Sequence, residues 1–230
     1  MRSLPDALAE CRSSIPAEIA HRLQPLFLSA ELRERLAFRL LVYARQGVPP
    51  LRPLPTFAGE CTPPLADAYA PFKECMAHVV EFPTDPANQR RLADALARAD
   101  SLNVLVLLGM RLTPASVTDE RGFPPPRERL VASATGGEGL SPAARALDKH
   151  APRNARHWGK PEGGTEEKNE NALGLVERIL DEATWWNVFG HFKHGLVYEA
   201  REPAGHGARW GHHGDEFIGF LEPFSDEEEP

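Results

Sequence analysis

The chain has 230 residues and a formal net charge of −7, and its apolar and charged fractions are those of a folded globular protein. This length fits one domain, or one domain with a smaller appendage. The acidic balance argues against a general binder of nucleic acids or anionic membranes, because neutralising phosphates requires a basic surface. Most of the 22 prolines lie between helical stretches, which indicates many short helices with stiff connections.

Recognisable targeting signals are missing from the sequence. The first residues contain no apolar segment of the signal-peptide type, and the most apolar run, residues 102–110, is too short to span a bilayer. We therefore expect a cytoplasmic protein that does not bind membranes. Cys11, Cys61 and Cys75 are widely spaced and form no CxxC pair, so we expect three free thiols.

Helical patterns dominate residues 1–113, which we treat as one helical region. The clearest helix follows Ser29, which is placed as an N-cap, and it ends at Gly47 before two prolines. Residues 84–100 carry a second amphipathic pattern with a proline in the first turn. The run 102–110 is ambiguous, but a strand there would stand alone among helices, so we expect a buried helix.

The middle of the chain alternates between irregular and helical stretches. Residues 114–140 are rich in proline and glycine and show little periodicity, so we expect a long loop or linker. Ser141 then restarts a helix as its cap. Thr165 caps a further helix, whose apolar positions keep the helical spacing as far as Trp186. We expect that helix to end near residues 189–190.

Beyond this helix the period changes to that of β-strands. Residues 196–201 alternate as a strand, and residues 208–223 contain two strands joined by a turn with glycine and aspartate. The tail, residues 225–230, is acidic. The expected fold class is mainly α with a small C-terminal antiparallel β-ribbon (α+β), and residues 141–224 form the part that bears the candidate site. Helices before strands argue against a parallel sheet.

The C-terminal part of the chain concentrates tryptophan, histidine and arginine. Arginine forks can grip an anionic ligand while tryptophans supply a stacking wall, and histidines can act as general acid or base. The catalytic candidates are His157, His191 and His194. The candidate ligand-binding residues are Trp158, Trp185, Glu199, Arg201, Arg209, Trp210 and Glu222. The alternative is that the charged groups are solvated and the tryptophans only pack the ribbon.

Two of these histidines are also weak candidates for a metal site. His191 and His194 are three positions apart, so both imidazoles would face one side of a continuing helix and could share an ion. A zinc site needs three or four convergent ligands, and neither HExxH nor a cysteine pair is present. The glycine-rich sequences that cradle nucleotides are absent as well. We therefore predict no metal and no cofactor.

A further motif lies in the helix that begins at Ser141. Arg145 and His150 are five positions apart in RALDKH, and this spacing resembles the arginine–histidine motif of HEPN-type ribonucleases. The resemblance covers one helix, and Ala146 stands where that family usually has a polar residue. It implies that Arg145 and His150 serve phosphodiester cleavage.

Three hypotheses for function follow. The first is a binding module whose C-terminal surface recognises a small anionic ligand or a partner peptide. The second is a hydrolase of esters or phosphodiesters, ribonuclease-like if the resemblance holds, with histidine as acid or base and Arg201 or Arg209 stabilising charge. The third is a structural subunit of an assembly. A concave pocket with histidine within reach of arginine or carboxylate would favour the enzyme.

Overall fold

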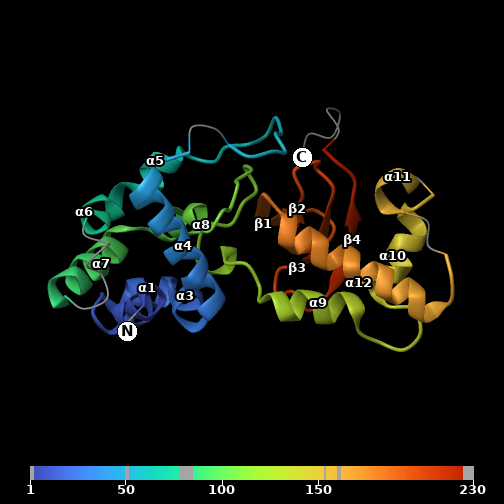
Figure 1. Cartoon of the computed structure of the whole chain (residues 1–230), viewed down its shortest axis with the longest axis horizontal. Helices are drawn as coiled ribbons and strands as arrows, with labels where there is room; N and C mark the ends of the chain where they lie inside the picture. The colour runs from blue at the N-terminus through green and yellow to red at the C-terminus, as the bar shows by residue number, and fades with distance from the viewer. Residues whose placement is uncertain (1–2, 50–51, 78–84, 153, 160–161, 225–230) are drawn as a thin grey trace. The chain divides into compact units, whose positions relative to one another are not determined.

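The computed structural model describes residues 3–49, 52–77, 85–152, 154–159 and 162–224. Helices predominate and a four-stranded antiparallel sheet closes the chain, which confirms the predicted α+β class (Figure 1). The chain forms two compact units. The first comprises Met1–Arg52, Cys61–Met110 and Thr118–Phe123, and the second comprises Pro53–Glu60, Arg111–Val117 and Pro124–Pro230. Among the described residues, no helix is long and apolar enough to cross a membrane.

The first unit is built from helices whose caps follow the sequence signals. Ser29 accepts a hydrogen bond from the backbone N–H of Leu32, and Gly47 adopts a φ of 73° at the end of the same helix. The run 102–110 contributes a buried helix, as predicted. The elements are α1 Leu4–Glu10, η1 Cys11–Ser13, α2 Ala17–Arg22, α3 Gln24–Leu28, α4 Ala30–Gln46, α5 Leu65–Tyr69, η2 Ala70–Phe72, α6 Lys73–Met76, α7 Pro86–Arg98, α8 Ser101–Leu107 and η4 Glu120–Gly122.

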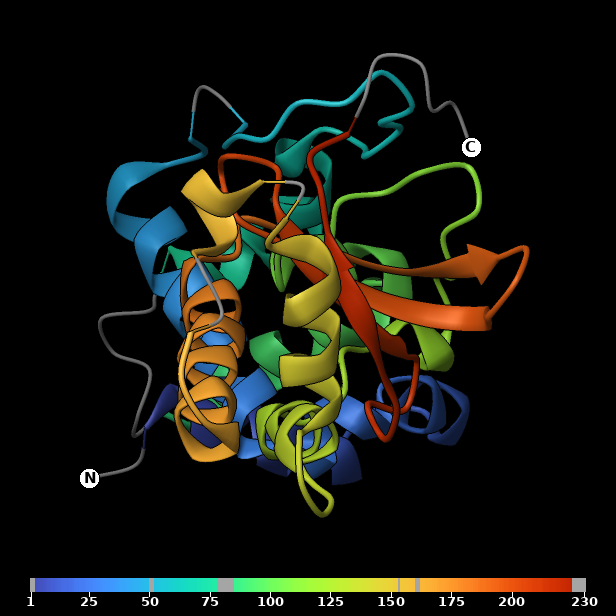
Figure 2. The same ribbon diagram turned by 90° about the vertical axis from the view of Figure 1, so that its right-hand side faces the viewer.

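The second unit combines helices with the sheet. Its elements are α9 Arg127–Thr135, α10 Pro142–His150, α11 Ala155–Trp158, α12 Thr165–Glu182, β1 Trp185–His191, β2 Gly195–Arg201, β3 Gly207–Gly211 and β4 Phe217–Leu221. The strands pair in chain order as an antiparallel meander. Figure 2 shows the strands side by side, and α10 and α12 contact β4 and β2.

Two expectations from the sequence are wrong in this unit. The stretch 114–140 is not all loop, because residues 127–135 form α9. Leu130 and Ala134, one helical turn apart, are buried, but two apolar positions are too few to reveal the helix in the sequence. The helix that begins at Thr165 ends at Glu182 rather than near residue 190, and the residue in the N-cap position is Gly164.

The segment expected to continue α12 is the strand β1. Trp186 fits the helical spacing of α12, but a strand points neighbouring side chains to opposite faces, and both faces are covered here. Trp185 packs edge-on against Phe57, with ring centroids 5.7 Å apart, while Trp186 lies 6.1 Å from Tyr198. Burial on both sides therefore outweighs the helical pattern, and the ribbon gains a fourth strand.

The register of the sheet determines at which end of the sheet the polar residues after β2 and β4 lie. Arg201 at the end of β2 pairs with Gly207 at the start of β3, which pairs with Leu221 at the end of β4. The next residues along the chain, Glu202 and Glu222, therefore leave the sheet at the same end. The antiparallel pairing thus gathers side chains from separate parts of the sequence.

Candidate functional site

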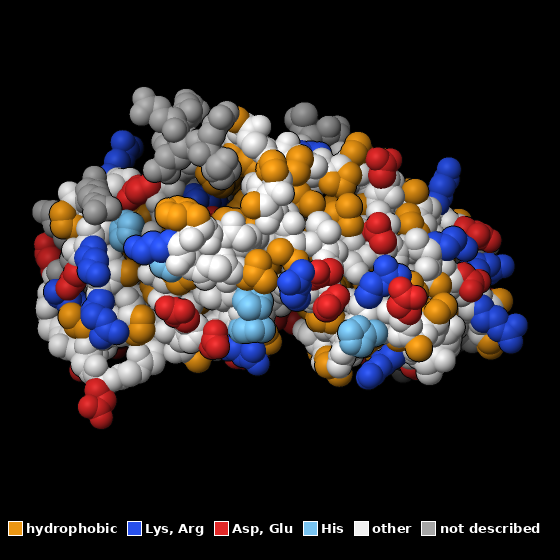
Figure 3. All heavy atoms as spheres, turned by 180° about the vertical axis from the view of Figure 1, so that it is seen from behind, with side chains coloured by type: hydrophobic (Ala, Val, Ile, Leu, Met, Phe, Trp, Pro, Cys, Tyr) orange, Lys and Arg blue, Asp and Glu red, His pale blue; other side chains and the backbone are white. Residues whose placement is uncertain are grey.

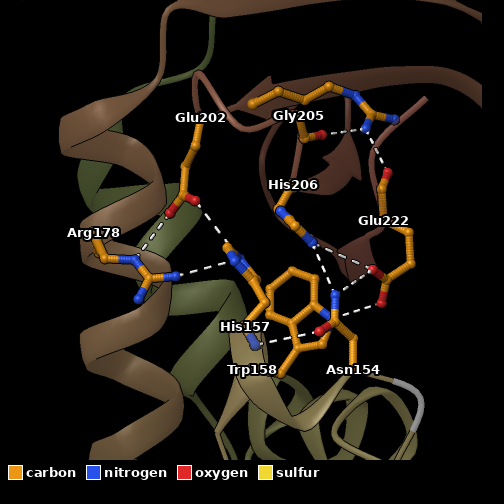
Figure 4. Close-up of polar contacts among 9 residues, drawn as sticks. Asn154, His157, Trp158, Arg178, Glu202, Gly205, His206 and Glu222 are labelled. Carbon is orange, nitrogen blue, oxygen red and sulfur yellow. Dashed lines mark hydrogen bonds and ion pairs between the residues drawn. The ribbon is translucent and has the colours of Figure 1, made fainter.

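A group of polar and aromatic side chains converges at this end of the sheet (Figure 4). We call it the histidine cluster. Its members are His150, Asn154, His157, Trp158, Arg178, Glu202, His206 and Glu222. They come from α10, α11, α12, the β2–β3 turn and the residue after β4, so no single motif contains them.

The short helix α11 displays two of the members. The side chain of Asn154 caps it by accepting a hydrogen bond from the backbone N–H of His157 at 3.3 Å. Gly159 ends it with a φ of 74°, a left-handed conformation that glycine adopts without steric cost. His157 and Trp158 are thereby held on one turn of helix, directed toward the sheet.

The β2–β3 turn supplies Glu202 and His206. The backbone N–H of Glu202 donates to the carbonyl of His206 at 2.8 Å, and that of Gly205 donates to the carbonyl of Glu202 at 2.8 Å. Gly205 has a φ of 91°, and an added Cβ would lie 3.0 Å from Pro223. A tight turn with a required glycine therefore fixes the spacing between the carboxylate and the imidazole.

His157 occupies the centre of the cluster. Its ring stacks on that of His206 with centroids 3.3 Å apart. Its Nε2 lies 3.6 Å from Glu202 Oε2 and 3.4 Å from Arg178 Nη2, while Arg178 Nε donates to Glu202 Oε1 at 2.9 Å. The imidazole thus lies beside a guanidinium and a carboxylate that are themselves paired.

Glu222 joins the other members. Trp158 Nε1 donates to Oε1 at 2.6 Å, and Asn154 Nδ2 donates to Oε2 at 3.3 Å. His206 Nε2 lies 3.4 Å from Oε2, and His150 Nδ1 lies 3.8 Å from Oε1. One carboxylate therefore fixes an indole and an amide and faces two imidazoles.

The electrostatics of the cluster favour neutral His157 and His206 rings and an ionised Glu222. Burial lowers the pKa of His157 below its ordinary 6.5, and the neighbouring His206 lowers it further. Burial also lowers the pKa of His206, although Glu222 opposes the shift. For Glu222, burial raises the pKa, but the hydrogen bonds from Trp158 and Asn154 outweigh it and the pKa is lowered. A neutral imidazole near pH 7 can accept a proton.

The cluster opens into a pocket of about 390 Å³. His157 and Arg178 line it, so the central imidazole and a cation are both presented to whatever fills the pocket. The remaining lining residues are Leu147, Trp158, Gly159, Asn171, Gly174 and Leu175. This is the concave arrangement that favours an enzyme over a flat binding surface.

Four of the residues singled out from the sequence lie in the cluster: His150, His157, Trp158 and Glu222. Arg201 lies next to it: Nη1 donates to the carbonyls of Gly205 and Glu222, both at 2.8 Å. Its Nε donates to Glu199 at 3.2 Å. The side chain of Arg201 is only 6% exposed. It therefore binds backbone carbonyl groups and does not face an open cavity.

The other predicted residues lie elsewhere in the unit. Arg209 pairs with the buried Glu199 and lies 2.9 Å from His191 Nε2. His191 ends β1 and His194 follows in the β1–β2 turn, so they do not share a helix face as expected. Burial lowers the pKa of His191, and the positive charge of Arg209 lowers it further. Among the described residues, no three His, Cys, Asp or Glu side chains are grouped to hold a metal ion.

The predicted tryptophans outside the cluster are packing residues. Trp210 is fully buried and its Nε1 donates to the carbonyl of Leu130 at 3.0 Å. Trp185 is 1% exposed and packs between aromatic rings of the same unit. Of the RALDKH pair, His150 faces Glu222, whereas Arg145 is exposed and donates to the carbonyl of Leu140.

Sequence reasoning missed four members of the cluster: Asn154, Arg178, Glu202 and His206. One signal was available, since Glu202 and His206 flank a glycine turn between two strand patterns. Arg178 lies on an amphipathic helix whose polar side is mostly solvated, and nothing in its spacing marks it. Only the packing of α12 near the turn gives it partners.

Comparison with known protein families gives a match to part of the second unit. Residues 131–222 match the family model of the CdiA C-terminal tRNase toxin domain. The match covers less than half of the chain, but it contains every member of the histidine cluster. No curated protein and no solved structure matches the chain. This similarity supports a nuclease or toxin, so the hydrolase hypothesis fits better than the binding module.

Proposed function

We propose that the second unit is a ribonuclease that cleaves tRNA, with His157 as the general base. One observation carries the proposal: the pocket presents His157 and Arg178 together, inside the region similar to a tRNase toxin domain. The anionic ligand expected from the sequence is then a phosphodiester of RNA. Because tRNA is found in the cytoplasm, the enzyme would act there.

The cluster supports a defined reaction. His157 Nε2 takes the proton from a ribose 2′-hydroxyl, and the 2′-oxygen attacks the adjacent phosphorus. The bond from phosphorus to the 5′-oxygen breaks, and that oxygen takes up a proton from solvent. The products are a 2′,3′-cyclic phosphate and a 5′-hydroxyl. Arg178 stabilises the negative charge that develops on the phosphate oxygens.

The other members hold these groups in place. Glu202 binds Arg178 through Nε and leaves Nη2 beside His157. His206 stacks on the His157 ring, and Glu222 and Asn154 hold His206 in turn. A base held by stacking on one side and by polar contacts with Arg178 and Glu202 on another loses little orientational freedom in the reaction.

The charge of −7 does not oppose this proposal. It argues against binding nucleic acid along a broad basic surface, and on the face shown in Figure 3 acidic and basic side chains are interspersed among the described residues. A ribonuclease that engages a folded RNA at one compact site needs only local cations, and Arg178 is one of them. The partner peptide considered in the sequence analysis stays a prediction.

The test is cleavage of purified tRNA by the full chain and by His157→Gln. We expect the wild-type protein to produce fragments with 2′,3′-cyclic phosphate ends, and the variant to cleave roughly 10²- to 10⁴-fold more slowly. His213→Ala, on the exposed β3–β4 turn, is the matched control and should cleave at the wild-type rate. Unchanged cleavage by His157→Gln, with an unchanged melting temperature, would refute the assignment.

A further inference from the structure

The pocket beside His157 has a wall formed by α12, of which the proposed reaction uses only Arg178. Asn171, Gly174 and Arg178 follow one another at helical spacing on α12 and all line the pocket. Arg178 lies at the end next to His157, and Asn171 lies two turns away from it. The wall therefore leads from the reacting group to a site about two helical turns distant.

Gly174 is the unusual residue of this wall. Glycine in a helix interior is less favourable than alanine, because it loses more backbone freedom on folding. It does not have the left-handed φ that would require glycine, and a Cβ added to it would meet nothing within 4 Å. Neither the backbone nor the packing of the protein explains the glycine. Space for a ligand close to the helix backbone does explain it.

The remaining lining residues define what this space accepts. Leu147 and Leu175 are buried apolar side chains, and Trp158 adds an aromatic surface. Asn171 contributes an amide that both donates and accepts hydrogen bonds. A flat aromatic ligand with polar edges matches this combination of apolar, aromatic and amide side chains, and a nucleobase has that chemistry.

We propose that the pocket between α10, α11 and α12 is a nucleobase subsite, in which Gly174 makes room for the base and Asn171 contacts its edge. The inference rests on the proposed ribonuclease function and adds where the nucleotide next to the cleaved phosphate binds. Arg178 then contacts the phosphate while the base occupies the space over Gly174. Asn171 is the residue that determines base preference.

The experiment uses binding rather than cleavage, so that it does not depend on catalysis. The four nucleoside 3′-monophosphates are titrated separately into the full chain, and affinity is measured by calorimetry. We expect at least one to bind. Gly174→Leu, which fills the space with a side chain, should weaken that binding at least tenfold, while Gly174→Ala weakens it less and raises the melting temperature.

Two further variants sharpen the test. Glu177→Leu places the same side chain on an exposed position of α12 outside the pocket and should bind like the wild type. Asn171→Ala should change the ranking of the four nucleotides. The subsite is refuted if no monophosphate binds the wild-type chain, or if Gly174→Leu binds as well as the wild type.

The outcomes separate the two proposals. If the wild-type protein does not cleave tRNA but Gly174→Leu abolishes nucleotide binding, the reaction fails and the subsite stands. If cleavage depends on His157 but Gly174→Leu binds the monophosphates as well as the wild type, the reaction stands and the subsite fails.

Discussion

The imidazole rings of His157 and His206 stack face to face with their centroids 3.3 Å apart. One ring comes from a single-turn helix and the other from the turn between β2 and β3. Burial lowers the pKa of both rings, and the neighbouring His206 lowers the pKa of His157 further. The pair therefore links the helical part of the second unit to its sheet in a way that depends on protonation.

The first prediction is that acid destabilises the protein through these two rings. A histidine whose folded pKa lies below its ordinary 6.5 contributes stability that is complete above pH 6.5 and is lost as pH falls toward the folded value. Thermal melts between pH 5 and pH 8 should show this fall. In His157→Phe the pH dependence should be weaker, and an equally steep fall would show that other groups cause it.

The second prediction concerns Glu222, whose charge opposes the lowering of the His206 pKa. Removing the charge in Glu222→Gln should lower the pKa of His206 further, because the imidazolium loses its nearest counter-ion. Titration of the His206 ring by NMR measures this directly. Glu216→Gln, exposed on the β3–β4 turn, is the control and should leave that pKa where it is.

The third prediction separates packing from ligand binding at Arg201. Its partner Glu199 is buried and also pairs with Arg209, so Arg201→Ala removes one of the two guanidinium groups that balance this carboxylate. Breaking a buried ion pair costs roughly 3–5 kcal/mol. Any loss of tRNA cleavage by Arg201→Ala should be matched by a lower free energy of unfolding, measured by urea denaturation. A variant that is fully stable but inactive would instead support direct contact between Arg201 and the ligand.

The fourth prediction concerns Trp210, whose ring is fully buried on the helix-covered face of the sheet. Trp210→Ala should lower the free energy of unfolding by about 3–5 kcal/mol, as a large core truncation does. Trp210→Phe keeps most of the packing and loses the hydrogen bond to the Leu130 carbonyl, so its cost should be smaller. Equal costs would mean that the hydrogen bond, not the packing, dominates.

The fifth prediction is a difference among the thiols. Cys61 is exposed, whereas Cys11 and Cys75 are buried, and burial raises the pKa of Cys75 to about 12. A thiol reagent should modify Cys61 quickly in the native protein and the other two only after denaturation. Rapid modification of more than one thiol before unfolding would contradict the buried positions.

The sequence alone determined the local elements with strong signals. Ser29 with Gly47, and Ser141 with Pro142, mark helix ends through hydrogen bonds made by the capping residue itself. The alternation of residues 196–201 likewise predicts β2, because successive side chains of a strand point to opposite faces. These features depend on neighbours within a few residues, and the α+β class follows from their order.

Tertiary structure decided β1 and the histidine cluster. Trp186 satisfies a helical pattern, but its segment pairs with β2, and Phe57, far away in the sequence, packs against the neighbouring Trp185. His157 gains partners from α12 and from the β2–β3 turn only because the sheet register places that turn beside α11. The sequence shows each of these residues, but it does not show which distant segments pack against one another, and that packing creates the contacts.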